Sequence, residues 1–219
     1  MKRAAIAGVL ALAVGAVGVG LFFRGQRSDV VSIATLPAYQ DRALLERAWS
    51  LPVAKTFPRP LLSQGNPTVC GPASLANVLR SEGVATTIDR AAEAAGCTWG
   101  LCLTGRTLDQ LAAGAKALGL EASVLRPSTV EGLREELRHA NDPSRRYLVN
   151  FHRGPLFGRG GGHHSPIGGY LEDLDLVFVL DVNASYGPWL VPVERLFAAM
   201  NTDDDTSGQK RGLLLLKKT

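Results

Sequence analysis

The chain has little cysteine and no concentrated positive charge. Only three of its 219 residues are cysteines, and none lies near the N-terminus, which excludes a lipidated N-terminus. The formal net charge is +4, and Lys and Arg are scattered among carboxylates rather than gathered in a block with aromatic residues. Nucleic acid is therefore not an expected partner. Internal repeats are also lacking.

What the chain does have is a long uncharged run at its start. Ala4 to Phe23 carry no charge and are flanked by Lys2, Arg3 and Arg24. As a helix this run would rise about 30 Å, enough to cross a bilayer, with the basic N-terminus held in the cytoplasm. A cleaved signal peptide is the alternative, although no clear A-x-A site follows the run. Under either interpretation the rest of the chain is exported, to the periplasmic face of the inner membrane or as a soluble periplasmic protein.

The remaining residues predict one domain of the α+β class. Residues 1–27 are interpreted as the anchor or signal peptide, 28–59 as an approach segment and 60–219 as the main globular domain. Apolar periodicity and turn residues place helices in the first half and strands in the second, which predicts helices packed on an antiparallel sheet. Helices are predicted over 40–50, 70–80, 88–96, 107–118, 129–140 and 192–200, and strands over 147–151, 165–171, 176–182 and 213–216.

Cys70 is a candidate nucleophile. Pro72 suits the first turn of a helix, which places Cys70 at the helix N-terminus. Free N–H groups and the helix dipole there stabilise a thiolate. A small buried side chain without chemistry is the alternative interpretation.

His163 and Asp181 are candidate partners of that thiol. If Glu172 and Asp173 form the tip of a hairpin, the numbers of opposed residues sum to about 345, and 163 + 181 = 344. The two side chains are then expected to lie opposite each other, give or take a bulge. A carboxylate in that place holds an imidazole in one tautomer and leaves its other nitrogen for the thiol.

Cys97 and Cys102 remain as an even pair. Their spacing permits a local disulfide in an oxidising compartment, and this is the favoured interpretation. Two reduced buried thiols and a soft-metal site are the alternatives, although two thiolates alone make a poor zinc site.

Several motifs together resemble the phytochelatin synthase family. They are Gln64-x5-Cys70-Gly71-x-Ala73-Ser74-Leu75, Gly162-His163-x-Ser165-Pro166-Ile167-Gly168-Gly169-Tyr170, Leu180-Asp181-Val182, Ala199-Met200-Asn201-Thr202 and Gln209-Lys210-Arg211-Gly212. The first motif alone is shared with bacteriocin-processing peptidases of the same papain-like clan. The resemblance covers about 160 residues (60–219) and implies a papain-like fold with Cys70, His163 and Asp181 as the catalytic triad.

The resemblance implies chemistry on glutathione, γ-Glu-Cys-Gly. Cys70 would attack the Cys–Gly peptide carbonyl, glycine would leave, and water or a second glutathione would resolve the γ-Glu-Cys thioester. By position, Gln64 is expected to donate to the oxyanion. Asn150, Gly162, Asp204 and Arg211 match the residues that bind the substrate, with Arg211 on the α-carboxylate and Asp204 on the α-ammonium group.

The resemblance implies no fixed cofactor and no metal held by the protein. A heavy-metal ion such as cadmium or zinc would enter as the metal–glutathione thiolate. A homodimer is left open.

Two departures from the family favour hydrolysis over chain extension. After Val182 the chain reads Asn183-Ala184-Ser185-Tyr186-Gly187-Pro188, one residue shorter than is usual in the family and without its two positive charges. The chain also ends without the Cys-rich extension of plant members. The alternatives are a membrane-tethered peptidase that cuts peptide leaders and a non-catalytic domain that binds thiols or peptides.

Overall fold

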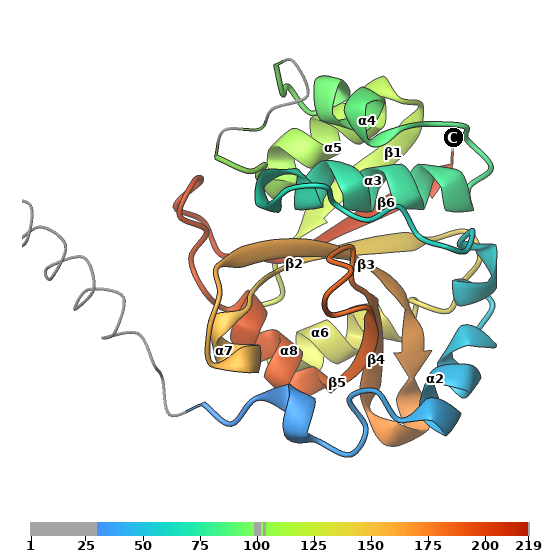
Figure 1. The fold of residues 1–219 in the computed structure, drawn as a ribbon, viewed down its shortest axis with the longest axis vertical. Coiled ribbons are helices and arrows are strands. Elements are labelled where there is room, and N and C mark those ends of the chain that lie inside the picture. Colours follow the sequence, from blue (N-terminus) through green and yellow to red (C-terminus); the bar gives the residue numbers. More distant parts are fainter. Residues whose placement is uncertain (1–29, 99–101, 103, 219) are drawn as a thin grey trace, which may run out of the picture.

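A six-stranded antiparallel sheet runs through the computed structural model, which describes residues 30–98, 102 and 104–218 (Figure 1). The strand order is β1-β6-β2-β3-β4-β5. The strands are β1 Leu120–Leu125, β2 Arg146–His152, β3 Gly162–Leu171, β4 Leu176–Leu180, β5 Pro188–Pro192 and β6 Leu213–Lys218. The helices are α2 Arg42–Trp49, α3 Cys70–Ser81, α4 Ile88–Ala94, α5 Leu108–Ala117, α6 Val130–Leu137, α7 Gly154–Phe157 and α8 Val193–Met200.

Four of the described helices, α2, α4, α5 and α6, begin at a side-chain cap. The side chains of Asp41, Thr87 and Thr129 accept backbone N–H groups at the starts of α2, α4 and α6. At the start of α5, Thr107 and Gln110 form a reciprocal capping box. The helix predicted over 107–118 is thereby confirmed, within one residue at each end.

The sheet has an apolar core on each face. Because side chains alternate along a strand, Leu148 of β2 joins the core built with α3 and α5, whereas Tyr147 and Val149 join the core built with α6 and α8. Figure 1 shows α3, α4 and α5 on one side of β2 and β3, and α6, α7 and α8 on the other. The α+β class is confirmed.

Two strands were not predicted. β1 pairs with β6, and β5 pairs with β4, so the two missed strands form the two edges of the sheet. β5 begins and ends with proline, which an edge strand tolerates because only one of its sides pairs with another strand.

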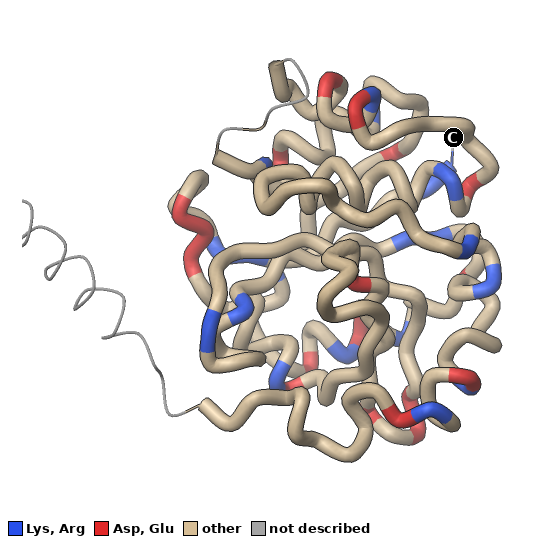
Figure 2. The backbone as a smooth tube through the Cα atoms, in the orientation of Figure 1, with Lys and Arg blue, Asp and Glu red and all other residues tan. Residues whose placement is uncertain are grey.

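The segment before residue 60 packs against the domain. Ile33, Ala48 and Phe57 are buried, and Ala48 and Phe57 lie in the same core as α3. Acidic and basic residues are interspersed over the described chain (Figure 2). None of the described helices is both long and apolar enough to cross a bilayer. The anchor or signal peptide predicted over 1–27 lies outside the described residues.

Candidate active site

Cys70 opens helix α3, as predicted. A short 3-10 turn, Pro67–Val69, leads into the helix, and the Asn66 side chain accepts the Thr68 N–H at its start. The side chain of Val69, the residue before the helix, offers no cap, so the first-turn N–H groups point their partial positive charge at the thiol end. Cys70 is 5% exposed and lines a pocket.

His163 and Asp181 are in contact. His163 Nε2 lies 3.0 Å from Asp181 Oδ1, and both residues are 4% exposed. Nε2 is therefore held by the carboxylate, which leaves Nδ1 as the other ring nitrogen.

The strand pairing that brings these two residues together differs from the predicted hairpin. The turn is a 3-10 segment, Glu172–Leu174, followed by Asp175 in a left-handed conformation, rather than a two-residue tip. Paired residue numbers sum to 347 beside the turn (171 + 176) and to 346 beyond a bulge (167 + 179), where the ladder of β3 and β4 ends. His163 instead pairs with Phe151 of β2, and Asp181 follows the last residue of β4. The contact was predicted correctly, but the direct cross-strand pairing was wrong.

Asp181 is held by three further donors that sequence reasoning missed. Arg153 Nη2 donates to both carboxylate oxygens, at 2.9 and 2.8 Å. Trp189 Nε1 donates to Oδ2 at 2.9 Å, and the Asn183 backbone N–H donates to Oδ1 at 2.9 Å. Arg153 also lies 3.9 Å over the ring of Tyr186. These donors hold the carboxylate ionised and fixed beside His163.

The electrostatics favour a thiolate–imidazolium pair. Burial alone raises the pKa of Cys70, but hydrogen bonds to His163 and His164, with the charge of His163, bring it well below its usual value. Burial opposes protonation of His163, but the hydrogen bonds to Asp181 and Cys70 raise its pKa. Burial likewise opposes ionisation of Asp181, and the hydrogen bond from His163 with the charges of His163 and Arg153 lowers its pKa. The arrangement can supply both a nucleophile and a proton donor.

His164 is a second histidine beside the thiol. Its Nδ1 lies 3.8 Å from Cys70 Sγ, and it lines the same pocket. The sequence showed the pair His163-His164, but the family motif singled out only His163.

A second polar cluster lies along the same pocket. Arg211 Nη1 donates to Asn150 Oδ1 and to Asp204 Oδ2, both at 3.0 Å, and Asn150 Nδ2 donates to Asp204 Oδ2 at 3.0 Å. All three residues are buried. Burial opposes ionisation of Asp204, and hydrogen bonds from Asn150 and the backbone, with the charge of Arg211, lower its pKa.

Gly162 makes room for this cluster. A Cβ atom there would lie 2.5 Å from Arg211 Nη1. The residue matched by position as substrate-binding thus acts by having no side chain. The structure brings the four residues matched as substrate-binding into one neighbourhood.

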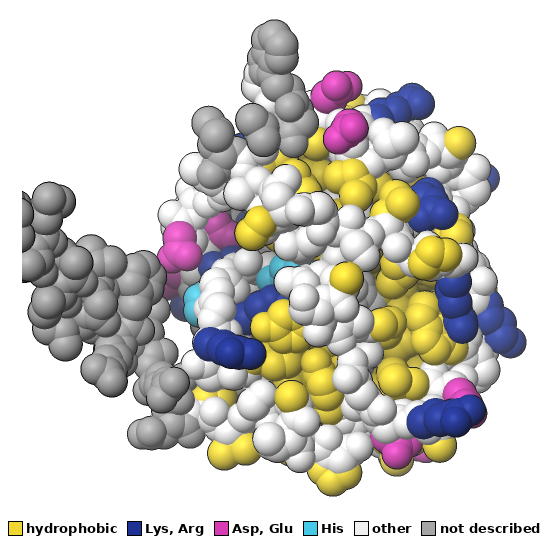
Figure 3. All heavy atoms as spheres, viewed as in Figure 1, with side chains coloured by type: hydrophobic (Ala, Val, Ile, Leu, Met, Phe, Trp, Pro, Cys, Tyr) yellow, Lys and Arg dark blue, Asp and Glu magenta, His cyan; other side chains and the backbone are white. Residues whose placement is uncertain are grey.

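One pocket of about 330 Å³ joins the thiol and this cluster, a volume within the range of small-molecule sites. Figure 3 shows histidine side chains in a hollow beside charged side chains. Its lining includes Cys70, His164, Thr104, Arg106, Asp204 and Arg211.

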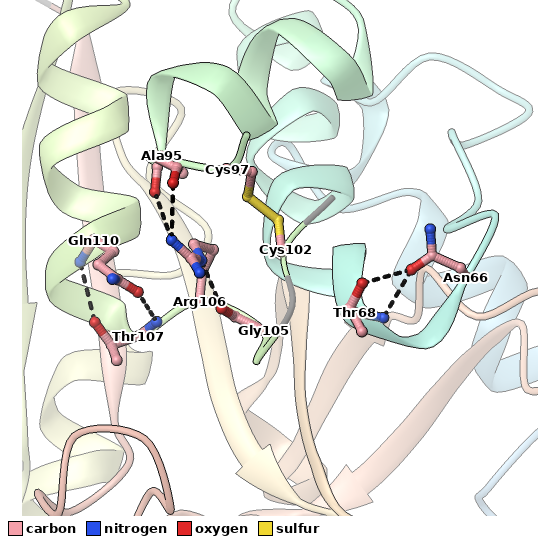
Figure 4. The surroundings of a disulfide bond; sticks show 10 residues. Asn66, Thr68, Ala95, Cys97, Cys102, Gly105, Arg106, Thr107 and Gln110 are labelled. Carbon is pink, nitrogen blue, oxygen red and sulfur yellow. Dashed lines mark hydrogen bonds between the residues drawn. A yellow bond between two sulfur atoms is a disulfide. The ribbon is translucent and has the colours of Figure 1, made fainter. Parts of the chain in front are cut away.

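The wall of the pocket is fastened by a disulfide. Cys97 and Cys102 are joined, as the favoured interpretation predicted, next to Arg106, whose guanidinium donates to the Gly96 carbonyl at 3.1 Å (Figure 4). The Thr206 hydroxyl donates to the Thr104 carbonyl at 3.3 Å, which ties this wall to the loop that carries Asp204.

Gln64 lies near the triad through its backbone. Its N–H donates to the carbonyl of Val182, the residue after Asp181, at 2.8 Å. Its side-chain Oε1 is buried and has no hydrogen-bond partner among the described residues. Its role as an oxyanion donor stays a prediction.

No group of three or more His, Cys, Asp or Glu side chains is placed to hold a metal ion in the described part of the chain. The prediction of no resident metal stays a prediction.

Solved structures with a similar fold are cysteine peptidase domains. The peptidase domain of Streptococcus ComA gives a TM-score of 0.52 at 21% identity, covering 73% of this chain and 98% of that one. A double glycine motif protease from an AMS/PCAT transporter gives 0.52 at 18% identity, covering 77% and 99%. At these identities the likeness shows the fold alone. The predicted papain-like fold is confirmed.

Curated relatives are similar over about half of the chain. Glutathione gamma-glutamylcysteinyltransferase 3 of Lotus japonicus is 36% identical over 118 residues, which is 52% of this chain and 25% of that protein. Glutathione gamma-glutamylcysteinyltransferase 1 of Arabidopsis thaliana is 33% identical over 101 residues, 45% of this chain and 21% of that protein. The alignments thus span about a quarter or less of these relatives.

The phytochelatin synthase family matches residues 100–213, slightly more than half of the 219 residues. The matched range contains His163, Asp181 and the polar cluster of Asn150, Asp204 and Arg211, whereas Cys70 precedes it. The chain belongs to the phytochelatin synthase family.

Proposed function

We propose that the protein cleaves the Cys–Gly bond of glutathione through a thioester on Cys70. The observation that carries the proposal is the single pocket shared by Cys70 and the Asp204–Arg211 pair, in a chain whose relatives are glutathione gamma-glutamylcysteinyltransferases. A nucleophile at one end and matched charges at the other suit a short peptide with a zwitterionic γ-glutamyl end.

The polar cluster recognises that end. Arg211 is 4% exposed, and its Nε has no hydrogen-bond partner among the described residues. A carboxylate in the pocket would complete its charge-assisted bonds, and the ionised Asp204 would accept from the α-ammonium group. Asn150 donates to Asp204 and accepts from Arg211, and so holds both members of the Arg211–Asp204 ion pair in fixed places.

Acylation uses the thiolate and the imidazolium. Cys70 Sγ attacks the carbonyl carbon of the Cys–Gly bond, and the oxyanion is stabilised by the backbone N–H of Cys70 with Gln64. His163 Nδ1 then gives its proton to the glycine nitrogen, which leaves, while Asp181 holds the ring through Nε2.

Water is the favoured acceptor of the acyl group. The segment Asn183–Pro188 holds no Lys or Arg that could bind the carboxylates of a second glutathione. Tyr186 of this segment stacks on Arg153, and that guanidinium is already engaged by Asp181. Hydrolysis to glycine and γ-Glu-Cys is therefore proposed as the main reaction. A heavy-metal ion would enter with the substrate, as a metal–glutathione thiolate.

The proposed site of action is the periplasmic face of the inner membrane. The uncharged run Ala4–Phe23, with Lys2 and Arg3 before it, supports an N-terminal anchor or a signal peptide. The disulfide between Cys97 and Cys102 supports an oxidising compartment.

The test is product analysis with the full chain. The detergent-solubilised protein and its Cys70→Ala variant are incubated with glutathione, with and without cadmium, and products are followed by mass spectrometry. Glycine and γ-Glu-Cys are expected in equal amounts from the native chain only. Glycine release that survives Cys70→Ala would sink the mechanism, and cadmium-stimulated (γ-Glu-Cys)n-Gly oligomers as main products would overturn the preference for hydrolysis.

Two other outcomes select the alternatives. Cleavage of peptides after Gly-Gly with glutathione untouched would identify a leader peptidase. A non-catalytic binding domain would show two results together: no turnover of any substrate, and a Cys70 that reacts with iodoacetamide no faster than an ordinary thiol.

A further inference from the structure

His164 sits beside the nucleophile in a fixed position. Its Nδ1 lies 3.8 Å from Cys70 Sγ, and both side chains are buried, with the two residues 4% and 5% exposed. The Ser74 hydroxyl is 2.8 Å from the Cys70 carbonyl and 3.0 Å from the His164 carbonyl. This hydroxyl ties the first turn of α3 to β3, so the thiol and the ring are held together by the fold.

The other nitrogen of His164 indicates the tautomer. Nε2 is buried and has no hydrogen-bond partner in the described part of the chain. A buried N–H without an acceptor is rare and costly, whereas a bare acceptor is better tolerated. A proton on Nε2 would also turn the Nδ1 lone pair toward the anionic sulfur. The proton therefore belongs on Nδ1, facing Cys70.

We propose that His164 is a further catalytic residue, a second N–H donor to the Cys70 thiolate that keeps its proton throughout the reaction. His163 and His164 then have separate tasks. His163, coupled to Asp181, moves protons, whereas His164 stabilises the sulfur anion without exchanging a proton.

The separation matters at each step of the proposed reaction, on which this catalytic role rests. During acylation the S–C bond forms, the C–N bond breaks, and the amine takes the Nδ1 proton of His163. During hydrolysis His163 takes a proton from water, the hydroxyl oxygen bonds to the acyl carbon, and the C–S electron pair returns to sulfur. The departing thiolate meets the Nδ1–H of His164, so a donor is present whatever the charge of His163.

Ionisation of Cys70 can be measured without any substrate. Of the three cysteines, Cys97 and Cys102 are joined, so Cys70 is the only free thiol and its alkylation by iodoacetamide reports on it alone. The titratable and charged groups that face it are His163 and His164 of β3, backed by Asp181 and Arg153, and the pocket residues Arg106, Asp204, Asp205 and Arg211.

The experiment compares four full-length chains: native, His164→Phe, His164→Asn and His164→Gln. Phe keeps a flat ring without nitrogen, Asn keeps an N–H near the Nδ1 position, and Gln places its amide near Nε2. The second-order alkylation rate is measured from pH 4 to 10. The midpoint is expected to rise by about one pH unit, a tenfold loss of thiolate, in the Phe and Gln variants and to return toward the native value in the Asn variant.

Coincident profiles of the native, Asn and Gln chains would overturn the inference, and this comparison stands even if the Phe variant does not fold. Glycine release from glutathione is measured on the same chains, so that a failure of this inference can be told apart from a failure of the proposed function. A native chain that ionises Cys70 through His164 yet leaves glutathione intact refutes the proposed substrate only. A chain that cleaves glutathione with the same alkylation profile in every variant refutes the role of His164 only.

Discussion

The buried carboxylate of Asp181 accepts hydrogen bonds, all within 3.0 Å, from four residues: His163, Arg153, Trp189 and the backbone of Asn183. Both of its oxygens are therefore held by donors. A site organised in this way positions one imidazole nitrogen and leaves the other free for the sulfur.

Asp181→Asn removes the charge but keeps the shape. An amide can offer an N–H instead of an acceptor to His163 Nε2, which favours the wrong tautomer. kcat for glycine release is expected to fall on the order of 10³-fold, while KM changes little. Steady-state kinetics with glutathione check this, and a kcat within threefold of the native value would contradict the role of Asp181.

The glycine run before His163 offers a matched pair of variants. A Cβ at Gly162 would lie 2.5 Å from Arg211 Nη1, whose end is held by Asn150 and Asp204 and cannot swing aside freely. At Gly161 a Cβ would meet nothing within 4 Å. Gly162→Ala is expected to raise KM for glutathione about tenfold, the effect of losing one charge-assisted hydrogen bond, and Gly161→Ala to leave it unchanged. Equal KM values would refute the placement of the γ-glutamyl end.

The pH profile follows from the directions of two pKa shifts. The reactive form pairs the Cys70 thiolate with the His163 imidazolium. Activity rises as the thiol loses its proton and falls as the imidazolium loses its own. Because the pKa of Cys70 is lowered well below its usual value and that of His163 is raised, kcat/KM is expected to be flat on both sides of neutral pH. A profile that still rises through pH 8 would show an ordinary thiol.

The proximity of Cys70, His163 and Asp181 could be predicted because each lies in a local pattern: a helix start, a glycine run and the end of a strand. Arg153 and Trp189, which reach Asp181 from the loop after β2 and from β5, were missed. The spacing of apolar residues along the sequence does not show which group the polar end of a long side chain reaches. The partner of His164 was missed for the same reason, since only the packing of α3 on β3 places it by Cys70.

Among the elements, the short connection after α4 shapes the pocket. The bond between Cys97 and Cys102 holds this connection, and Thr104 and Arg106 beyond it line the pocket opposite Asp204. The disulfide thus lies beside one wall of the proposed glutathione pocket.

The double variant Cys97→Ser, Cys102→Ser tests whether the disulfide is linked to substrate binding. Without the bond the wall loosens, so KM for glutathione is expected to rise several-fold while the iodoacetamide rate of Cys70 stays near the native value. Loss of a disulfide that closes so short a loop costs about 2 kcal/mol of folding stability, so thermal unfolding is measured as a control. An unchanged KM in a stable variant would contradict the link.

The two edge strands, β1 and β5, could not be predicted from the local sequence pattern. β1 alternates buried and exposed residues at its start, a pattern that indicates a strand, but it follows a helix directly and is only six residues long. β5 has prolines at both ends, which usually signal a loop. The central strands could be predicted because they are apolar on both faces. Whether an edge segment forms a strand depends on the strand it pairs with, which the local sequence does not show.

For the molecule as a whole, the proposed location rests on the start of the sequence. The uncharged run Ala4–Phe23 is expected to hold the protein in the inner membrane with residues 28–219 outside the cytoplasm. Fractionation after an alkaline carbonate wash is expected to leave the full-length protein in the membrane pellet. A full-length protein in the cytoplasmic fraction would refute export, and a shortened periplasmic form would identify a cleaved signal peptide.

The same fold carries peptidase domains and this chain, so the fold does not choose the substrate. We propose that the choice is made by the pocket that Cys70 shares with Asp204 and Arg211. The central claim is that Cys70 carries the γ-Glu-Cys acyl group between glycine release and hydrolysis.

Intact-mass spectrometry of the acid-quenched protein during turnover tests this claim most directly. The account predicts a γ-Glu-Cys adduct that maps to the peptide containing Cys70, is removed by hydroxylamine and is absent from Cys70→Ala. Glycine release at the native rate with no adduct on Cys70, or with an adduct elsewhere, would contradict it.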